Sequence, residues 1–151
     1  MKKILIPILT TAAITPVVAT SVSCGSAINL MFKTVGDQGL FYVDNFNIEV
    51  GKKYTFDIKL SEASETLLDK WESPTFIASD PSNSKEPEII PESLKVKLNG
   101  KDITKDKQKV QISTASVTII KGSKWTTQDK IIITVSFKNA MKKGGIYFGE
   151  F

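Results

Sequence analysis

Histidine and arginine are missing from the sequence, and its 151 residues include a single cysteine. Without histidine the chain cannot build a Ser-His-Asp or Cys-His catalytic site, an HExxH metalloprotease site or a Cys/His zinc site. A lone cysteine cannot form an internal disulfide. Without arginine the chain also lacks the planar donor that binds carboxylate or phosphate through two parallel hydrogen bonds. We therefore predict a protein that is not an enzyme and that needs no cofactor and no metal.

The chain also has little excess of charge of one sign. Lys2 and Lys3 belong to the N-terminal leader, and residues 24–151 contain 18 lysines against 16 acidic residues, a formal charge of +2. These charges are interspersed along the sequence, which is typical of a solvated surface and argues against a nucleic-acid partner. Hydrophobic residues make up 41% of the chain and charged residues 24%, which is ordinary for a globular domain.

The first 23 residues have the three parts of a secretory signal. Lys2 and Lys3 give it a positive start, residues 4–22 carry no charge, and small residues lie just before Cys24. In such signals the positive end stays inside, the apolar stretch enters the membrane and the small residues allow cleavage. We predict that residues 1–23 form a signal helix that is removed.

The residues Ser21-Val22-Ser23-Cys24 resemble a bacterial lipobox, and the leader is similar to those of mollicute-type lipoproteins. The resemblance covers about the first 24 residues and has Ser21 where leucine is commonest. It implies cleavage between Ser23 and Cys24 and a diacylglyceryl group, with chains such as palmitate, on the Cys24 sulfur. Two acyl chains anchor a protein stably where one does not. The expected location is the extracytoplasmic face of the cell membrane, with residues 24–28 as a lipidated tether.

Two other fates of the leader stay open. The uncharged stretch of 19 residues is barely long enough for a permanent transmembrane helix, which Pro7 and Pro16 would weaken. Ordinary signal peptidase cleavage after Ala19 would instead release a free protein that starts at Thr20.

Alternation of apolar and polar residues dominates the chain after the leader. It is clearest in residues 46–50, 54–60, 94–98 and 131–137, where every second residue is apolar. A period of two is typical of half-buried antiparallel strands. Shorter candidate strands are residues 30–35, 40–43, 110–113, 117–121 and 146–151. These segments predict a mostly all-β domain.

Turn residues separate the predicted strands. Asn99-Gly100, between two apolar runs, predicts a two-residue hairpin because both positions accept positive φ. Residues 36–39, 51–52 and 142–145 supply further turns, and residues 64–71 predict one short helix with Leu67, Leu68 and Trp71 on one side. We expect residues 29–151 to form one domain, an antiparallel immunoglobulin-like β-sandwich with one short helix.

The longest predicted loop, residues 79–93, is one candidate contact region. Three prolines deny it backbone donors, and long loops in compact domains often carry function. Its polar residues Asp80, Asn83 and Glu86 are candidate contacts. They do not form an EF-hand, because Lys85 and Pro91 stand where that calcium loop needs glycine and glutamate.

Trp125 is the other candidate contact. It lies in residues 122–127, a turn-like segment between two predicted strands. If exposed, its ring would mark a binding tip, since tryptophan is enriched in binding hot spots. The alternative interpretation is that Trp71 and Trp125 both cover the edge of the core.

Together these features predict a surface lipoprotein, anchored at Cys24, whose β domain binds an unknown protein or a host-surface molecule. One alternative is an ion- or solute-binding accessory lipoprotein of a membrane transporter. A weaker alternative is a small extracytoplasmic hydrolase that uses paired carboxylates.

Overall fold

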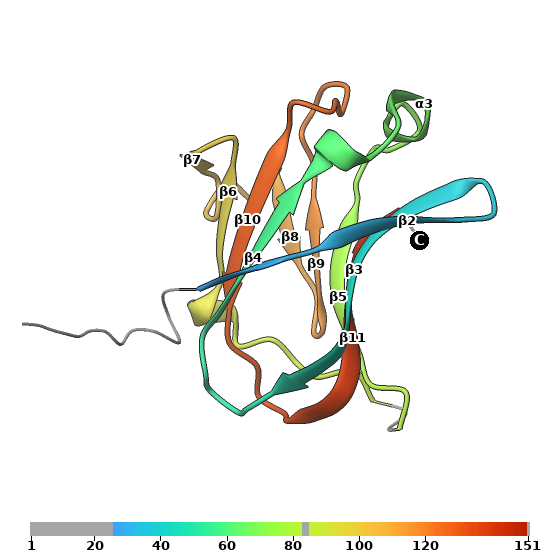
Figure 1. Ribbon diagram of the computed structural model, residues 1–151. Coiled ribbons are helices and arrows are strands. Elements are labelled where there is room, and N and C mark those ends of the chain that lie inside the picture. Colours follow the sequence, from blue (N-terminus) through green and yellow to red (C-terminus); the bar gives the residue numbers. More distant parts are fainter. Residues whose placement is uncertain (1–25, 83–84, 151) are drawn as a thin grey trace, which may run out of the picture.

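The computed structural model describes residues 26–82 and 85–150, and eleven strands in these ranges form two β-sheets (Figure 1). The five-stranded sheet has the order β1-β4-β10-β6-β7, and the six-stranded sheet has the order β2-β3-β11-β5-β9-β8. In chain order the elements are β1 (Ala27–Asn29), β2 (Met31–Val35), β3 (Gln38–Ile48), β4 (Tyr54–Lys59), η2 (Leu60–Glu62), α3 (Glu65–Leu68), β5 (Thr75–Ser79), η3 (Pro91–Ser93), β6 (Lys95–Leu98), β7 (Lys101–Asp102), β8 (Val110–Ile112), β9 (Ser116–Ile119), β10 (Lys130–Val135) and β11 (Met141–Gly149).

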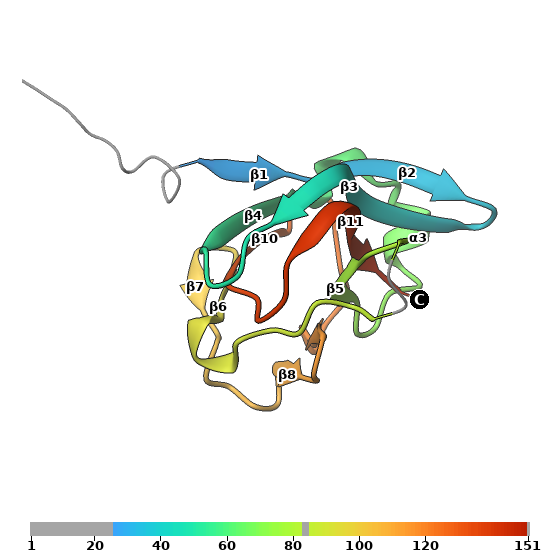
Figure 2. The ribbon, with the colours of Figure 1, turned by 90° about the horizontal axis from the view of Figure 1, so that it is seen from below.

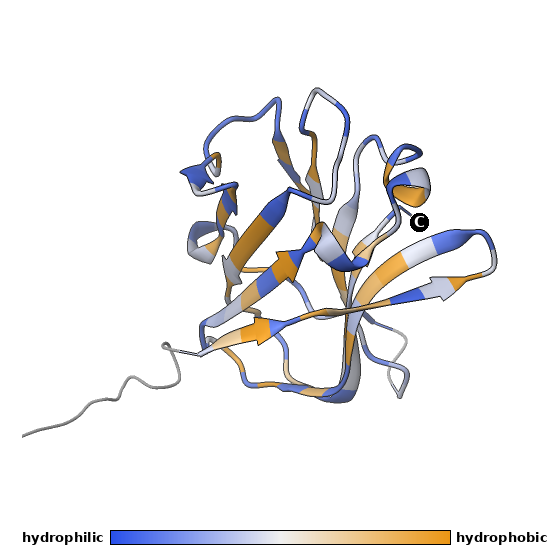
Figure 3. Ribbon diagram, turned by 45° about the horizontal axis from the view of Figure 1, so that its top comes forward, coloured by the Kyte–Doolittle hydropathy of each residue, from blue (hydrophilic) through white to orange (hydrophobic). Residues whose placement is uncertain are grey.

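The two sheets pack face to face as a β-sandwich, as the alternating pattern predicts (Figure 2). Hydrophobic and hydrophilic residues alternate along the strands, and the hydrophobic ones fill the space between the sheets (Figure 3). Phe56 and Ile133 of one sheet, and Phe41, Phe76 and Phe148 of the other, are completely buried there. The prediction of a mostly β fold with one short helix is confirmed.

A single extended segment joins the two sheets at their edge. β1 pairs with β4 in parallel, and after Leu30 the chain continues as β2, which pairs with β3 in the other sheet. Leu30 is 5% exposed, and its backbone N–H donates to the Asp57 carbonyl at 3.2 Å. The folded domain therefore starts at Ala27, so residues 27 and 28, assigned to the tether from the sequence, belong to the sheet instead.

Several strand boundaries differ from the prediction. Residues 40–43 and 46–50 were expected as two strands; residues 40–43 and 46–48 belong to the continuous strand β3, in which Asn45 has φ 54°, and residues 49–50 lie beyond its end. β11 starts at Met141 and takes in the expected turn at residues 142–145, with irregular register between Met141 and Ile146. β5 was not predicted, because its short sequence TFIAS lacks a long alternating run.

The predicted hairpin turn and helix are both present. Asn99 and Gly100 have φ values of 52° and 85° and connect β6 to β7. The helix is α3, of four residues, and the Ser64 hydroxyl caps it by accepting from the Leu67 N–H at 3.1 Å. Leu68 and Trp71 turn into the core.

Candidate functional site

Three of the residues proposed from the sequence, Ser23, Cys24 and Asn83, lie outside the described residues. Trp125 is described, and its ring is 1% exposed and packs edge-on against Trp71, with ring centroids 6.4 Å apart. Its indole N–H points to the Glu72 carbonyl at 3.5 Å. Trp125 is therefore not an exposed binding tip, and the alternative, that both tryptophans cover the core, agrees with the structure.

Asp80 and Glu86 also do not converge on a site. The Asp80 carboxylate accepts from the backbone N–H and the hydroxyl of Ser82, at 3.0 and 2.8 Å, and so closes its own turn. Glu86 is exposed. Within residues 26–82 and 85–150, no three histidine, cysteine or acidic residues lie close enough to hold a metal ion.

The two regions singled out from the sequence lie at opposite ends of the sandwich. The segment that carries Trp125 connects β9 to β10 at the top of Figure 1, and the segment after β5 lies at the bottom. Part of the latter is structural, because Ile89 is 2% exposed and bridges to Phe137. No single surface combines the two regions.

The structure instead gathers positive charge at the β6–β7 edge of the five-stranded sheet. Six lysines follow one another within 15 residues, accompanied only by Asp102 and Asp106, which gives this segment a formal charge of +4. We call these six lysines the lysine-rich edge: Lys95, Lys97, Lys101, Lys105, Lys107 and Lys109. The rest of residues 24–151 contains 12 lysines and 14 acidic residues. Outside this edge, the domain is thus slightly acidic.

Among the described residues, these lysines form no close ion pair with a carboxylate. The ion pairs within 4.0 Å between described residues involve Lys52, Lys59, Lys121, Lys124 and Lys130, and none of these lysines belongs to this edge. Asp102 Oδ1 accepts from the Thr104 N–H at 2.9 Å and from its hydroxyl, and Asp106 Oδ1 accepts from the Gln108 N–H at 3.0 Å. Both aspartates thus accept hydrogen bonds within turns of the backbone, and neither forms an ion pair within 4.0 Å with a lysine of this edge.

Four of the six lysines border one open concavity of about 480 Å³. Its rim carries Lys95, Lys101, Lys105 and Lys109, and the buried core residues Leu94 and Ile103 lie behind it. The Thr104 hydroxyl and N–H hold the pKa of Asp102 below its usual value, and the charges of Lys95 and Lys97 act in the same direction. The Asp102 side chain therefore stays ionised, and the four rim lysines outnumber the two carboxylates.

The backbone behind the concavity is well anchored. Ile103 is 5% exposed and donates its N–H to the Val96 carbonyl at 2.9 Å, while the Thr104 hydroxyl accepts from the Val96 N–H at 2.8 Å. Further on, the N–H groups of Lys109 and Val110 both donate to the Asp106 carbonyl, at 2.9 and 2.8 Å. The rim lysines therefore extend from a backbone whose position is set by the core.

A buried carboxylate holds the turn between β6 and β7. Asp129 is 4% exposed; its Oδ1 accepts from Asn99 Nδ2 at 2.8 Å, and its Oδ2 accepts from Lys121 Nζ at 2.6 Å and the Thr126 N–H at 2.8 Å. Asn99 in turn accepts from the Lys130 N–H at 2.8 Å. Burial alone would raise the pKa of Asp129, but the hydrogen bonds from Lys121, Asn99 and Thr126 outweigh it and lower the pKa.

Sequence reasoning missed the lysine-rich edge because it judged charge over the whole chain, where lysines and acids are interspersed. A count over residues 95–109 would have detected the local excess. The pattern KVKL-NG-K also places Lys95 and Lys97 on the outer face of a strand, opposite Val96 and Leu98, which are buried. That a hairpin and a loop bring Lys101, Lys105 and Lys109 to the same concavity as Lys95 could not be read from spacing alone.

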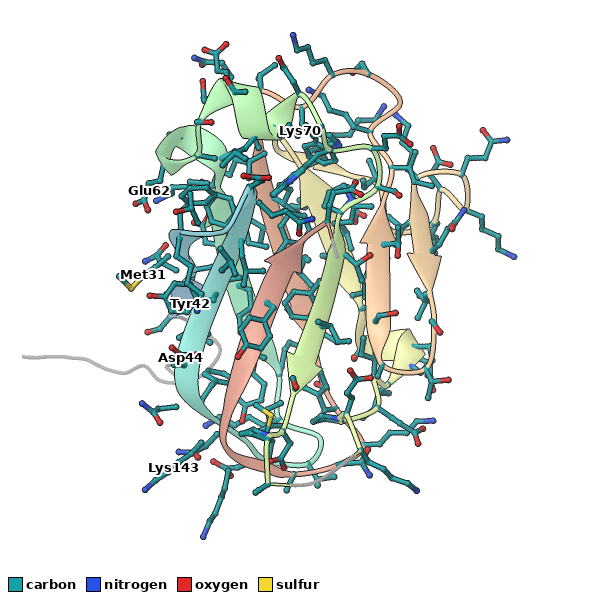
Figure 4. The ribbon with its side chains drawn as sticks, turned by 90° about the vertical axis from the view of Figure 1, so that its right-hand side faces the viewer. Met31, Tyr42, Asp44, Glu62, Lys70 and Lys143 are labelled. Atoms are coloured by element: carbon teal, nitrogen blue, oxygen red, sulfur yellow. The ribbon has the colours of Figure 1, made fainter. Side chains whose placement is uncertain are left out.

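A second exposed feature is the edge strand β2 with the hairpin that it forms. Met31 is 60% exposed and Val35 is 58% exposed, and Lys33 lies between them with its Nζ 4.3 Å from the centre of the Tyr42 ring. Figure 4 shows Met31 projecting from this edge, beside the six-stranded sheet, whose outer face is not covered by any helix of the described residues. This feature combines two exposed apolar side chains with one lysine, and its chemistry does not select a particular partner.

In the two described ranges, no helix has the length and hydropathy needed to cross a membrane. No protein-family model, no curated protein and no solved structure matches the chain.

Proposed function

We propose that the protein is a bacterial surface lipoprotein, held at the outer side of the cell membrane by acylated Cys24, whose β domain binds a partner without catalysing a reaction. The observation that carries this proposal is the position of the only cysteine. It directly follows a signal-like leader, and only Gly25 and Ser26 separate it from strand β1, which starts at Ala27. The lipidated residue would thus join almost directly to the folded sheet.

The same arrangement argues for a domain that works close to the bilayer. Three residue steps separate Cys24 from Ala27, a reach of about 11 Å at most. A domain on such a short tether stays near the membrane surface. It would meet molecules in the layer just outside the cell rather than search at a distance.

We also propose the immunoglobulin-like type for the sandwich. Its support is that several strands consecutive in sequence lie in opposite sheets: β3 and β4, β5 and β6, and β9, β10 and β11. Greek-key connections of immunoglobulin-like domains alternate between sheets in this way.

The N-terminal mass of the native protein tests the anchor. We expect the N-terminal peptide to begin at Cys24 and to carry the mass of a diacylglyceryl group. An intact Met1, or a start at Thr20 with a free thiol, would refute the proposal.

Replacement of the anchoring sulfur provides the matching cellular test. Cys24→Ala should lose the lipid and leave the detergent phase, because without two buried acyl chains nothing holds the domain stably. Ser23→Ala, a change between small residues at the same site, should keep both the lipid and the partitioning. If the Cys24→Ala protein has lost residues 1–23 and still stays with the membranes after an alkaline wash, the lipid-anchor proposal is wrong.

A further inference from the structure

The lysine-rich edge has a chemistry that selects its partner. Its lysines form no ion pair within 4.0 Å in the described structure, four of them border one concavity, and the backbone beneath is hydrogen-bonded to Val96 of strand β6, which is buried. An excess of positive charge costs folding stability through self-repulsion. An anion that approaches this edge would relieve that repulsion and would meet lysines already gathered at one place.

We infer that this concavity binds an anionic polysaccharide, one whose sulfate or carboxylate groups contact Lys95, Lys101, Lys105 and Lys109. The inference deepens the proposed function and rests on it, because it needs the domain to lie outside the cell. Lysine ammonium groups act as point charges and can bind sulfate and carboxylate groups in many orientations. A flexible chain of repeating charges fits an open concavity better than it would fit a closed pocket.

Two features of the site favour a polysaccharide over a nucleic acid. Single-stranded nucleic acids are bound by aromatic side chains that stack on bases, and the residues lining the concavity include none. Duplex DNA is read most often by arginine, which the chain lacks.

The position of the site disfavours lipid headgroups as its ligand. β1, where the tether enters, and β7 are the two edges of the five-stranded sheet (Figure 2). These edges are four strand positions apart, a span of about 19 Å at ordinary strand spacing. That span exceeds the reach of the tether, so the lysine-rich edge is the side of this sheet that is farther from the anchor.

The test measures by calorimetry how tightly the full processed protein binds heparin, which serves as the sulfated polysaccharide probe. A neutral detergent keeps the lipidated protein in solution. In the concavity variant Lys95, Lys101, Lys105 and Lys109 all become Gln. In the matched control Lys53, Lys70, Lys138 and Lys142 all become Gln, so both variants lose the same charge. We expect the concavity variant to bind heparin about tenfold more weakly or worse, with a shallower salt dependence, because fewer counterions are released. The control should stay within about twofold, because its lysines lie outside the site.

Three further arms make the result decisive. Replacement of the same four rim lysines with Arg keeps the charge and should keep binding, and near-ultraviolet circular dichroism should show all variants folded. Neutral dextran should not bind. Equal losses in the concavity variant and the control would overturn the site, and binding to duplex DNA that equals binding to heparin would overturn the polysaccharide assignment. Heparin binding is measured on purified protein, whereas the anchor is tested by the mass of the Cys24 peptide. A protein that does not bind heparin would therefore contradict this inference without contradicting the lipid anchor.

Discussion

At the scale of single residues, Asp129 holds the turn between β6 and β7, which carries part of the lysine-rich edge. It is the buried acceptor for three donors from three segments: Asn99 in the β6–β7 turn, Lys121 after β9 and Thr126 in the loop before β10. A buried carboxylate without these donors would be strongly destabilising, whereas a fully hydrogen-bonded one fixes the geometry of the groups around it. Asp129 thus links core stability to the position of the turn.

Asp129→Asn should lower the free energy of unfolding by about 2 kcal/mol, the usual scale for hydrogen bonds to a charged group. The amide keeps the shape of the side chain but leaves Lys121, whose side chain is 18% exposed, without its counter-ion. Urea denaturation measures the change. Asp69→Asn is the matched control: it removes an exposed pair with Lys124, whose N···O distance is 3.0 Å, and should change stability by less than about 0.5 kcal/mol. Equal effects of the two substitutions would contradict the role of Asp129.

The lowered pKa of Asp129 also makes stability depend on pH. A carboxyl group whose pKa is lower in the folded state contributes stability above its unfolded pKa of about 3.9 and loses it as pH falls through the folded value. We therefore expect the free energy of unfolding to fall between about pH 5 and pH 2. Asp129→Asn should show a shallower fall in the same urea series. Superimposable pH profiles of the two proteins would refute this prediction.

At the scale of elements, the edge segment β1–β2 contributes to both sheets. Ala27, Ile28 and Asn29 pair with β4, and residues 31–35 pair with β3. Leu30, at the crossing, is buried against the core, while its neighbour Met31 projects into solvent. The segment therefore closes one side of the sandwich and is the part of the fold nearest to the proposed anchor.

Leu30→Ala should destabilise the domain by about 3 kcal/mol, because it removes a buried side chain and leaves a cavity at the junction of the sheets. Met31→Ala, one residue further along, should change stability by less than about 0.5 kcal/mol, since Met31 is 60% exposed. Thermal and chemical unfolding of the two variants measure the difference. If Met31→Ala proved the more damaging change, the segment would not cross the sheets where the structure places it.

At the scale of the whole molecule, one continuous core connects both sheets and the loops around them. Trp71 contacts Phe41 and Phe148 of the six-stranded sheet, with ring centroids 6.2 and 5.7 Å away, and also contacts Trp125. Phe56 and Phe76, from opposite sheets, lie 5.2 Å apart between ring centroids. Because the buried residues of both sheets form one continuous cluster, neither sheet should be stable without the other.

The domain should therefore unfold in one cooperative transition. Tryptophan fluorescence reports the region of Trp71 and Trp125, and far-ultraviolet circular dichroism reports all strands. We expect the two signals to give the same midpoint in urea. Distinct midpoints would mean that the tryptophan region and the rest of the sandwich unfold independently.

The sequence alone determined the features that depend on neighbouring residues. A period of two predicts which residues of β4, β6 and β10 face inward, because successive side chains of a strand point to opposite faces. Asn99-Gly100 predicts its own turn, because both residues tolerate positive φ. The leader and Cys24 predict a lipid anchor by local chemistry that needs no fold, and that prediction awaits its test.

Only the tertiary structure decided which distant residues meet. It placed Trp125 in the core and joined two predicted strands into the single strand β3. It also brought Asp129 into hydrogen-bonding contact with Asn99, 30 positions away in the sequence. It also turned lysines that look dispersed into one edge with uncompensated charge. These outcomes depend on long-range pairing of strands and on how loops fold back over the core, and no local pattern of residues specifies either.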